Sequence, residues 1–231
     1  MLVEKEMSKQ KIDLYKQHHL LCDWYGASGV SYLKEVSLVI DYLKPKVVLD
    51  YGCGKGALIK VLAERYPHIK FYGYDPAILG MDNMPVDHAD LVLNTDVLEH
   101  IPEDDLIQTI QKISKISKNV FFALDHCLAG AILPNGENAH CCIRPREWYV
   151  ELICRYFPAV TSLDSNFKWK SVVLTFGVKA EFFNQYYQIL QGDFCKKQGG
   201  GKAKQIKYKI LSMITFGSRR LHYKKKLQMF N

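Results

Sequence analysis

The stretch VVLDYGCGKGAL, at positions 47–58, combines residue types that suit a ligand-binding loop. Gly52, Gly54 and Gly56 stand at alternate positions directly after an apolar, β-branched run, and Asp50 stands two residues before the first of them. Each glycine gives up side-chain burial and costs chain entropy on folding. Packing alone is therefore a poor explanation, and we expect a ligand to approach this backbone closely.

A second acidic residue, Asp75, ends the apolar run IKFYGYD 23 residues after Gly52. An acid at this distance from a glycine loop accepts both hydroxyls of a ribose in many nucleotide-binding sheets. The spacing D-x-G-x-G-x-G differs from the G-x-G-x-x-G of pyrophosphate loops, where an extra anion beside the phosphates is unfavourable. The Asp50 carboxylate instead favours a ligand with positive charge, held directly or through water.

The elements that must position these residues alternate between short apolar runs and longer periodic segments. This order predicts an α/β fold, with right-handed crossovers, a parallel sheet and helices on both faces. The loop after the first strand then faces the ligand crevice at the carboxyl edge of the sheet. Strands are predicted at 47–50, 69–75, 90–94, 119–124 and 171–178, and helices at 31–43, 57–66, 103–116 and 146–157. The stretch 8–22 is compatible with one or two helical turns on the surface.

Three motifs in this order, VVLDYGCGKG, GYDPA and DLVLNTDVLEHIPE, resemble those of class I S-adenosylmethionine-dependent methyltransferases over roughly residues 15–180. The resemblance implies a Rossmann-like class I methyltransferase sheet and the cofactor S-adenosyl-L-methionine. It implies that the glycine loop lines the methionine moiety, Asp75 holds the ribose, Pro76 and Ala77 lie near adenine, and residues 94–96 cover the methionine end. The cofactor-binding residues predicted here are Asp50, Gly52, Cys53, Gly54, Asp75, Pro76, Asn94, Thr95 and Asp96.

Only fourteen residues separate Asp75 from Asp90. This interval is too short for the usual helix, strand and helix, so we expect a sheet that is abbreviated between its second and fourth strand positions. The acid that commonly binds the adenine amino group in this family is consequently not assigned, and Asp82 and Asp87 are both candidates. Glu99 and His100 follow in the third motif, where capping of the next helix is the favoured role.

The segment after the predicted strand at 119–124 is where substrate loops gather in such a sheet. Its stretch LPNGENAH is similar to bacterial methyltransferases of sugar and surface-polysaccharide pathways, which suggests O-methylation of a polar sugar, a glycan or a small hydroxylated metabolite. Methyl transfer to a hydroxyl needs a base. His140, in a turn-forming stretch, is the predicted catalytic base, and a structural or exposed histidine is the alternative. Asp125, His126, Asn135, Asn138, Arg144 and Arg146 are further polar candidates in this segment.

The composition of the chain indicates its general class and its cellular compartment. With 48% hydrophobic residues, the chain buries a full core. The N-terminus lacks the apolar stretch of a secretory signal, and the apolar run at 120–134 is too short to cross a bilayer. The seven cysteines form no CxxC pair, so reduced thiols in a cytoplasmic protein without a metal site are expected.

The positive charge of the chain is concentrated at its C-terminus. Residues 191–231 hold eleven Lys and Arg against one acid, whereas residues 1–190 hold 20 basic and 23 acidic residues. The tail at 202–231 interleaves basic with apolar residues, which suits a peripheral contact with the inner membrane surface or a glycolipid, a nucleic acid, or a solvated extension. A solvated extension is the simplest of the three, and a nucleic acid is less favoured than a membrane because no recognition motif accompanies the charge.

These observations divide the chain into an N-terminal helical lid at 1–45, a methyltransferase core at 46–180 and a basic extension at 181–231. The predicted function is methyl transfer from S-adenosylmethionine to an oxygen of a small acceptor. Three alternatives stay open at this point: an RNA methyltransferase that holds phosphates with its tail, a non-catalytic cofactor-binding module, and a nicotinamide-dependent oxidoreductase.

Overall fold

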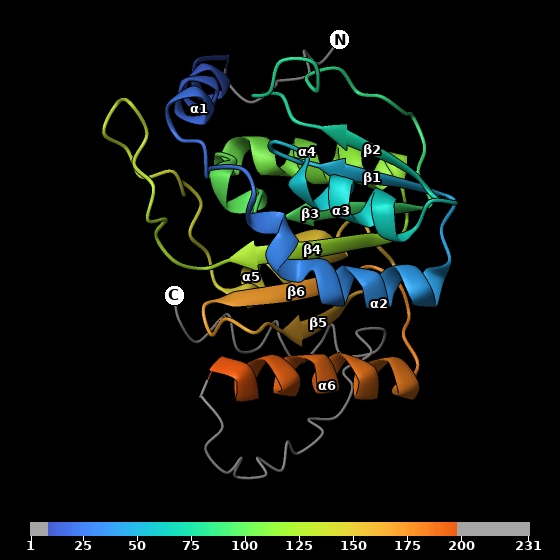
Figure 1. The fold of residues 1–231 in the computed structure, drawn as a ribbon. Coiled ribbons are helices and arrows are strands. Elements are labelled where there is room, and N and C mark those ends of the chain that lie inside the picture. The colour runs from blue at the N-terminus through green and yellow to red at the C-terminus, as the bar shows by residue number, and fades with distance from the viewer. Residues whose placement is uncertain (1–8, 198–231) are drawn as a thin grey trace.

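A computed structural model describes residues 9–197 of the chain, and the tail at 202–231 with its predicted contacts lies outside the described residues. Figure 1 shows the arrangement of the elements. The elements in chain order are α1 (Lys9–Leu21), η1 (Ser28–Tyr32), α2 (Leu33–Leu43), β1 (Val47–Tyr51), α3 (Ala57–Arg65), β2 (Lys70–Tyr74), β3 (Leu91–Thr95), η2 (Leu98–His100), α4 (Glu103–Ile116), β4 (Val120–Asp125), α5 (Arg146–Cys154), β5 (Thr161–Asp164), β6 (Lys170–Leu174) and α6 (Ala180–Lys197).

The six strands form one sheet in the order β2-β1-β3-β4-β6-β5. The first four are parallel, as the alternation of strands and helices predicts. The prediction of a parallel sheet is wrong for the other edge, because β6 runs antiparallel to both β4 and β5. The short loop 165–169 between β5 and β6 explains part of this difference, since a few residues can join only antiparallel neighbours.

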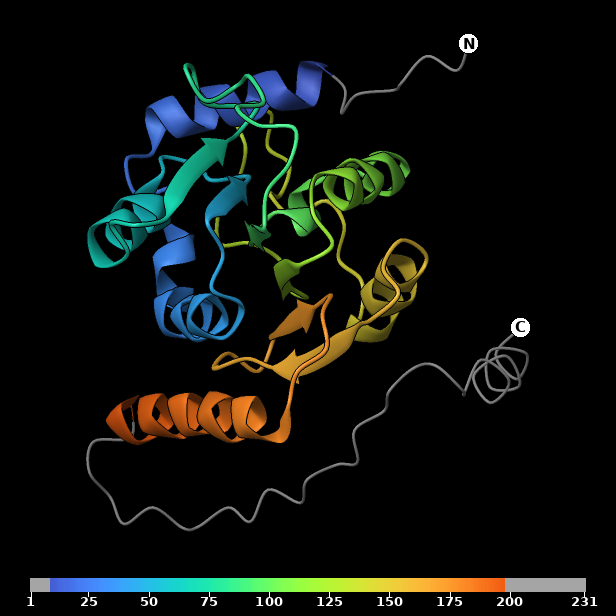
Figure 2. The ribbon, with the colours of Figure 1, turned by 90° about the vertical axis from the view of Figure 1, so that its right-hand side faces the viewer.

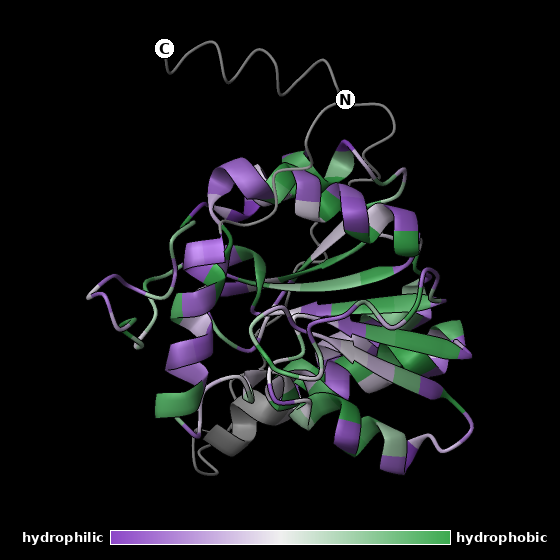
Figure 3. Ribbon diagram, turned by 90° about the horizontal axis from the view of Figure 1, so that it is seen from above, coloured by the Kyte–Doolittle hydropathy of each residue, from purple (hydrophilic) through white to green (hydrophobic). Residues whose placement is uncertain are grey.

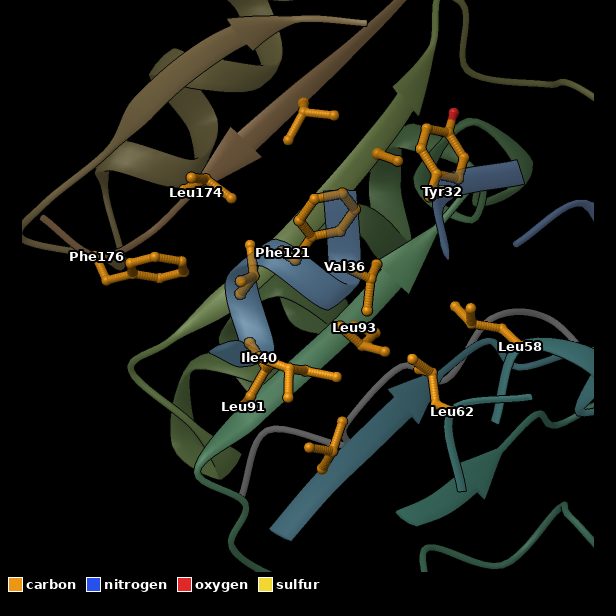
Figure 4. Packing of buried hydrophobic residues seen from close by; sticks show 14 of the residues in the cluster. Tyr32, Val36, Ile40, Leu58, Leu62, Leu91, Leu93, Phe121, Leu174 and Phe176 are labelled. Atoms are coloured by element: carbon orange, nitrogen blue, oxygen red, sulfur yellow. The ribbon is translucent and has the colours of Figure 1, made fainter. Parts of the chain in front are cut away.

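Helices cover both faces of the sheet, as predicted (Figure 2). Neighbouring residues along a strand point to opposite faces, so Leu93 and Phe121 pack with α2 and α3 in one buried cluster. Val92 and Phe122 pack with α4 and α5 in the other. Figure 4 shows the first cluster. In Figure 3 the strands are largely hydrophobic, and the helices that surround the sheet carry hydrophilic residues. The central strands are therefore fixed from both sides.

The helices at the edges of the predicted core are packed against it. Val36 and Ile40 of α2 belong to the first cluster, together with Phe182 and Tyr186 of α6. Both α2 and α6 therefore pack with the sheet. In the predicted division of the chain, α2 belongs to the N-terminal lid at 1–45 and most of α6 to the extension at 181–231. The predicted abbreviation of the sheet is confirmed, since no helix or strand stands between β2 and β3. Among the described residues, no helix is long and apolar enough to span a membrane.

Candidate cofactor and acceptor site

A cavity of about 1020 Å³ opens at the carboxyl ends of the parallel strands. Each of the four strands lines it with its last residue, Tyr51, Tyr74, Thr95 and Asp125. The parallel half of the sheet therefore gathers loops from four separate parts of the chain around one space, as open α/β sheets generally do. Figure 1 shows the loop after β4 and helix α1 on the side toward which the β4 arrow points.

The glycine loop follows β1 and turns back over the end of β2. The backbone N–H groups of Gly52 and Cys53 donate to the carbonyl oxygen of Tyr74 at 2.7 and 3.1 Å. Gly52 and Gly54 have φ angles of +85° and +53°, a region that favours glycine. A Cβ on Gly54 would lie 2.3 Å from the carbonyl oxygen of Gly26. Part of the need for glycine thus comes from the chain itself, which packs the loop around Gly26 against this turn.

Asp75 holds the loop from the end of β2. Its Oδ2 accepts a hydrogen bond from the Gly54 N–H at 2.9 Å, and its Oδ1 accepts one from the Ala77 N–H at 2.8 Å. Asp75, Pro76 and Ala77 all line the cavity. The carboxylate is therefore fixed in orientation at the cavity wall, with further lone pairs on both oxygens for a ligand.

Two of the predicted cofactor residues lie behind the cavity wall. Asp50 is 2% exposed, and its Oδ1 is buried without a hydrogen-bond partner. Burial, followed by the charge of Asp75, raises the pKa of Asp50 to about 7. Asn94 is fully buried, and its Nδ2 donates to the Tyr51 carbonyl oxygen at 2.8 Å. Neither side chain is among the lining residues. Asn94 supports β1 through this hydrogen bond, and its contact with the methionine end of the cofactor stays a prediction.

The end of β3 carries a strained acid. Thr95 and Asp96, both predicted to bind the cofactor, line the cavity. Asp96 has a φ of +54°, which is uncommon for a residue with a side chain and often marks a functional position. The Asp96 Oδ1 accepts a hydrogen bond from the Tyr32 hydroxyl at 2.9 Å, and Oδ2 lies 2.7 Å from Lys170 Nζ. The sequence analysis missed Tyr32 and Lys170, which stand 64 and 74 positions away along the chain.

The lining between residues 51 and 97 is acidic. It contains Asp75, Asp82 and Asp96 and, within this described range, no lysine, arginine or histidine, although Lys170 of β6 pairs with Asp96 and His19 stands beside Gly26 in the same cavity. Such a wall is unfavourable for a pyrophosphate and favourable for the sulfonium and ammonium groups of S-adenosylmethionine. Asp82 lines the cavity and Asp87 is not among the lining residues. The residues present therefore fit the cofactor that the sequence motifs imply.

The other end of the cavity is lined by His100 and His140. The two rings meet edge to face with their centroids 4.7 Å apart. The Nδ1 of His140 lies 2.6 Å from the Cys127 carbonyl oxygen, which accepts the proton, so Nε2 of the neutral ring keeps its lone pair. Burial, followed by His140, lowers the pKa of His100 to about 3. His140 thus lies in a polar corner of the cavity beside the neutral imidazole of His100.

Other polar candidates from the sequence have partners elsewhere. His126 lies 2.8 Å from the Ser171 hydroxyl. Arg144 pairs with Glu103, and Arg146 pairs with Asp164. None of the three is among the lining residues of the cavity, whereas Asp125 is. These arginines consequently do not contribute positive charge to the site.

Helix α1 and the residues after it cover the histidine end. The Tyr15 hydroxyl donates to the carbonyl oxygens of Ala139 and His100 at 2.7 and 3.0 Å. Tyr25 packs edge to face with His18 and His100. The N-terminal segment is thereby attached to both η2 and the loop that carries His140.

A Rossmann-like sheet with this acidic glycine loop defines the class of S-adenosylmethionine-dependent methyltransferases. A family model described as a methyltransferase domain matches residues 31–148. The chain belongs to this family.

Individual relatives agree on this class and differ in their substrates. Ribosomal RNA small subunit methyltransferase A of Mycoplasma mycoides subsp. mycoides SC is 30% identical over 114 residues, which are 46% of this chain and 41% of that enzyme. The chain thus spans about two fifths of this relative.

Two solved structures share the fold. An O-methyltransferase family protein from Burkholderia thailandensis aligns with a TM-score of 0.54 and 11% identity over 78% of this chain and 66% of that chain. The 1,6-didemethyltoxoflavin-N1-methyltransferase of the same species, solved with 1,6-didemethyltoxoflavin and S-adenosylhomocysteine, aligns with a TM-score of 0.51 and 13% identity over 74% of this chain and 89% of that chain. At these identities, both support the fold alone.

Proposed function

We propose that this protein transfers the methyl group of S-adenosylmethionine to a hydroxyl oxygen of a small polar acceptor, such as a sugar or a hydroxylated metabolite. The observation that carries the proposal is one cavity with two chemically different ends. Its acidic wall, with Asp75 and Asp82, suits the cofactor, and another part of it is lined by His100 and His140. Lys170, which also lines the cavity, pairs with both Asp96 and Asp125.

The size of the cavity supports a small acceptor. Pockets for single small ligands measure roughly 300–1,000 Å³, and the cavity of about 1020 Å³ lies just above that range. A cofactor and a small acceptor fit together in such a volume. In-line displacement at the methyl carbon requires this arrangement, because the acceptor, the methyl group and the sulfur must be aligned.

The polar end supplies what a hydroxyl acceptor needs. Asp125 and Lys170 offer hydrogen bonds that orient hydroxyl groups, and both line the cavity. His140 is the residue that we propose activates the acceptor hydroxyl, because its Nδ1 is engaged with Cys127 and its other nitrogen keeps a lone pair. In this proposal, the neutral imidazole of His100 packs beside His140.

The test separates cofactor binding from turnover. Titration with S-adenosylhomocysteine should raise the melting temperature by mass action, and a screen of hydroxylated acceptors with labelled cofactor should then find a methylated product. His140→Gln should lower turnover about 10²-fold or more with unchanged S-adenosylhomocysteine affinity, and the exposed His88→Gln is the matched control. Binding of NAD without binding of S-adenosylhomocysteine would overturn the proposal.

RNA is the second candidate acceptor, and the 30% identity to a ribosomal RNA methyltransferase favours it. An RNA substrate held by basic residues loses affinity steeply as salt is added. Binding of a structured RNA that weakens at least tenfold between 50 and 200 mM salt, roughly the behaviour of several phosphate contacts, would favour RNA over the small acceptor. No RNA binding at low salt would remove this candidate.

A further inference from the structure

We propose that Glu99, His100 and His140 bind a divalent transition-metal cation at the acceptor end of the cavity. One ligand atom from each residue lies within 4.8 Å of the other two. The inference deepens the proposed function, on which its catalytic part rests, but cation binding itself is measurable without any acceptor. The cysteine pattern, which lacks a CxxC pair, gave no indication of a metal site.

Glu99 is the first reason. It belongs to η2, it is fully buried, and neither carboxylate oxygen has a hydrogen-bond partner. A buried carboxylate without a partner is costly, so such groups are normally paired or bound to a metal. A bound cation would compensate the buried carboxylate.

The orientation of the two imidazoles is the second reason. The Nδ1 of His100 lies 2.9 Å from the Ala139 carbonyl oxygen, and that of His140 lies 2.6 Å from the Cys127 carbonyl oxygen. A carbonyl oxygen only accepts, so each ring donates from Nδ1 and keeps the lone pair on Nε2. Metal-binding histidines typically show this arrangement, in which a hydrogen bond to the second nitrogen fixes the tautomer and the ring.

The backbone holds the three residues together although they come from two segments. The Glu99 carbonyl oxygen accepts hydrogen bonds from the N–H groups of Cys141 and Cys142 at 2.9 and 3.0 Å. The loop that carries His140 is thereby attached directly to η2. Ligands of one metal ion at bond lengths of about 2.1 Å stand roughly 3–4 Å apart, so small side-chain rotations complete the coordination.

The ligand set indicates the kind of ion. Two imidazoles and one carboxylate suit first-row transition metals, whereas Mg²⁺ and Ca²⁺ prefer oxygen ligands. His100 and His140 line the cavity and Glu99 is not among the lining residues. The ion would therefore be held from the protein side and keep open positions toward the cavity, as catalytic metal sites do.

The cation would change how the acceptor hydroxyl is activated. A hydroxyl coordinated to a divalent ion loses its proton to water more readily. Its oxygen then forms the new bond to the methyl carbon as the carbon–sulfur bond breaks, which gives the methyl ether and S-adenosylhomocysteine. In this scheme His140 is a metal ligand. It then no longer acts as the general base that the sequence predicts, because the metal ion activates the acceptor hydroxyl.

Titration of the metal-free full-length protein with Co²⁺ tests the site, followed by visible absorption and by calorimetry. We expect one equivalent to bind with d–d bands and without a thiolate-to-cobalt charge-transfer band, since no cysteine belongs to the ligand set. Glu99→Gln and His140→Gln should each weaken binding about 100-fold or more, because even second-shell changes cost about 10–100-fold. The exposed His88→Gln should leave the affinity unchanged.

Two results would overturn the inference. One is absence of Co²⁺ binding; the other is binding with a charge-transfer band from a thiolate such as Cys141 and an affinity that His140→Gln does not alter. His140 stands in a loop, so that variant serves if Glu99→Gln fails to fold. Titration with S-adenosylhomocysteine on the same samples keeps the two proposals apart, because lost metal binding with intact cofactor binding contradicts only the metal site.

Discussion

The Nζ atom of Lys170 lies 2.7 Å from the Asp96 Oδ2 and 3.5 Å from the Asp125 Oδ2, so one ammonium group joins the ends of β3, β4 and β6. The Lys170 side chain is 13% exposed, and those of Asp96 and Asp125 are 7% and 10% exposed. The two carboxylates raise the pKa of Lys170 against the opposing effect of its burial. The ammonium thus compensates two buried negative charges where the parallel and antiparallel parts of the sheet meet.

Replacing Lys170 with methionine should destabilise the fold. The apolar stem is kept, but Asp96 and Asp125 lose the charge that compensates them. Removal of one partner from a buried ion pair costs about 3–5 kcal/mol, and we expect a loss near the lower figure in the free energy of unfolding. Urea denaturation measures it. Arg146→Met breaks the more exposed pair with Asp164 and should cost far less; equal losses for both variants would contradict this account.

Gly54→Ala should weaken cofactor binding and stability together. The new Cβ would stand 2.3 Å from the Gly26 carbonyl oxygen at a φ of +53°, so the loop must move away from the segment packed on it. Forcing a residue with a side chain into such a conformation costs about 1–3 kcal/mol. Calorimetry with S-adenosylhomocysteine and thermal melting measure the two effects. Gly177→Ala, where nothing lies within 4 Å of the added Cβ, is the control, and identical behaviour of the two variants would refute the expectation.

The parallel half of the fold was predictable because each element carries its own signal. The predicted helix at 103–116 matches α4 (Glu103–Ile116), since an apolar stripe at helical spacing survives in any context. β5 was missed because its four residues TSLD include only one buried side chain, Leu163. α6 was missed because its residues were assigned to the basic extension at 181–231, although residues 180–195 contain no lysine or arginine.

The site was predictable only where its signal is local. Asp75 and the glycines stand at fixed spacings, and all of them except Gly56 line the cavity. Tyr32 and Lys170 reach Asp96 through the fold, so no local pattern could indicate them. Glu99 was expected to cap a helix, because a sequence does not report that a carboxylate is fully buried without a partner.

Asp75→Asn should reduce the affinity for S-adenosylhomocysteine, although the asparagine side chain has nearly the same shape as that of aspartate. The carboxylate accepts from the N–H groups of Gly54 and Ala77, and an amide nitrogen would face one of these donors. A hydrogen bond between a ligand and a charged group contributes about 1.5–3 kcal/mol, so loss of the predicted ribose contact of Asp75 should raise the dissociation constant at least about tenfold. Calorimetry checks this value, with the exposed Asp87→Asn as the control. An unchanged dissociation constant would show that Asp75 does not contact the ligand.

Asp50 should make stability fall as the pH rises toward neutrality. Its pKa is about 7 in the folded protein and 3.8 in an unperturbed chain. Between these values, the folded state binds a proton that the unfolded state has released, so this group stabilises the fold at low pH and that contribution is lost as the pH approaches 7. One such proton corresponds to at most about 1.4 kcal/mol per pH unit.

Asp50→Asn isolates this contribution, because the amide has nearly the same shape and does not titrate. Urea denaturation at several values between pH 5 and 8, a window that lies above the unperturbed pKa of 3.8 and includes the folded-state pKa of about 7, should show the variant gaining stability relative to the wild type up to about pH 7. The gain should then level off, since the wild-type carboxyl is ionised in both states above that value. Asp87→Asn should show no such trend. A difference between Asp50→Asn and wild type that stays constant across the window would mean that Asp50 is already ionised beneath the glycine loop, and that its buried Oδ1 has a donor in solution.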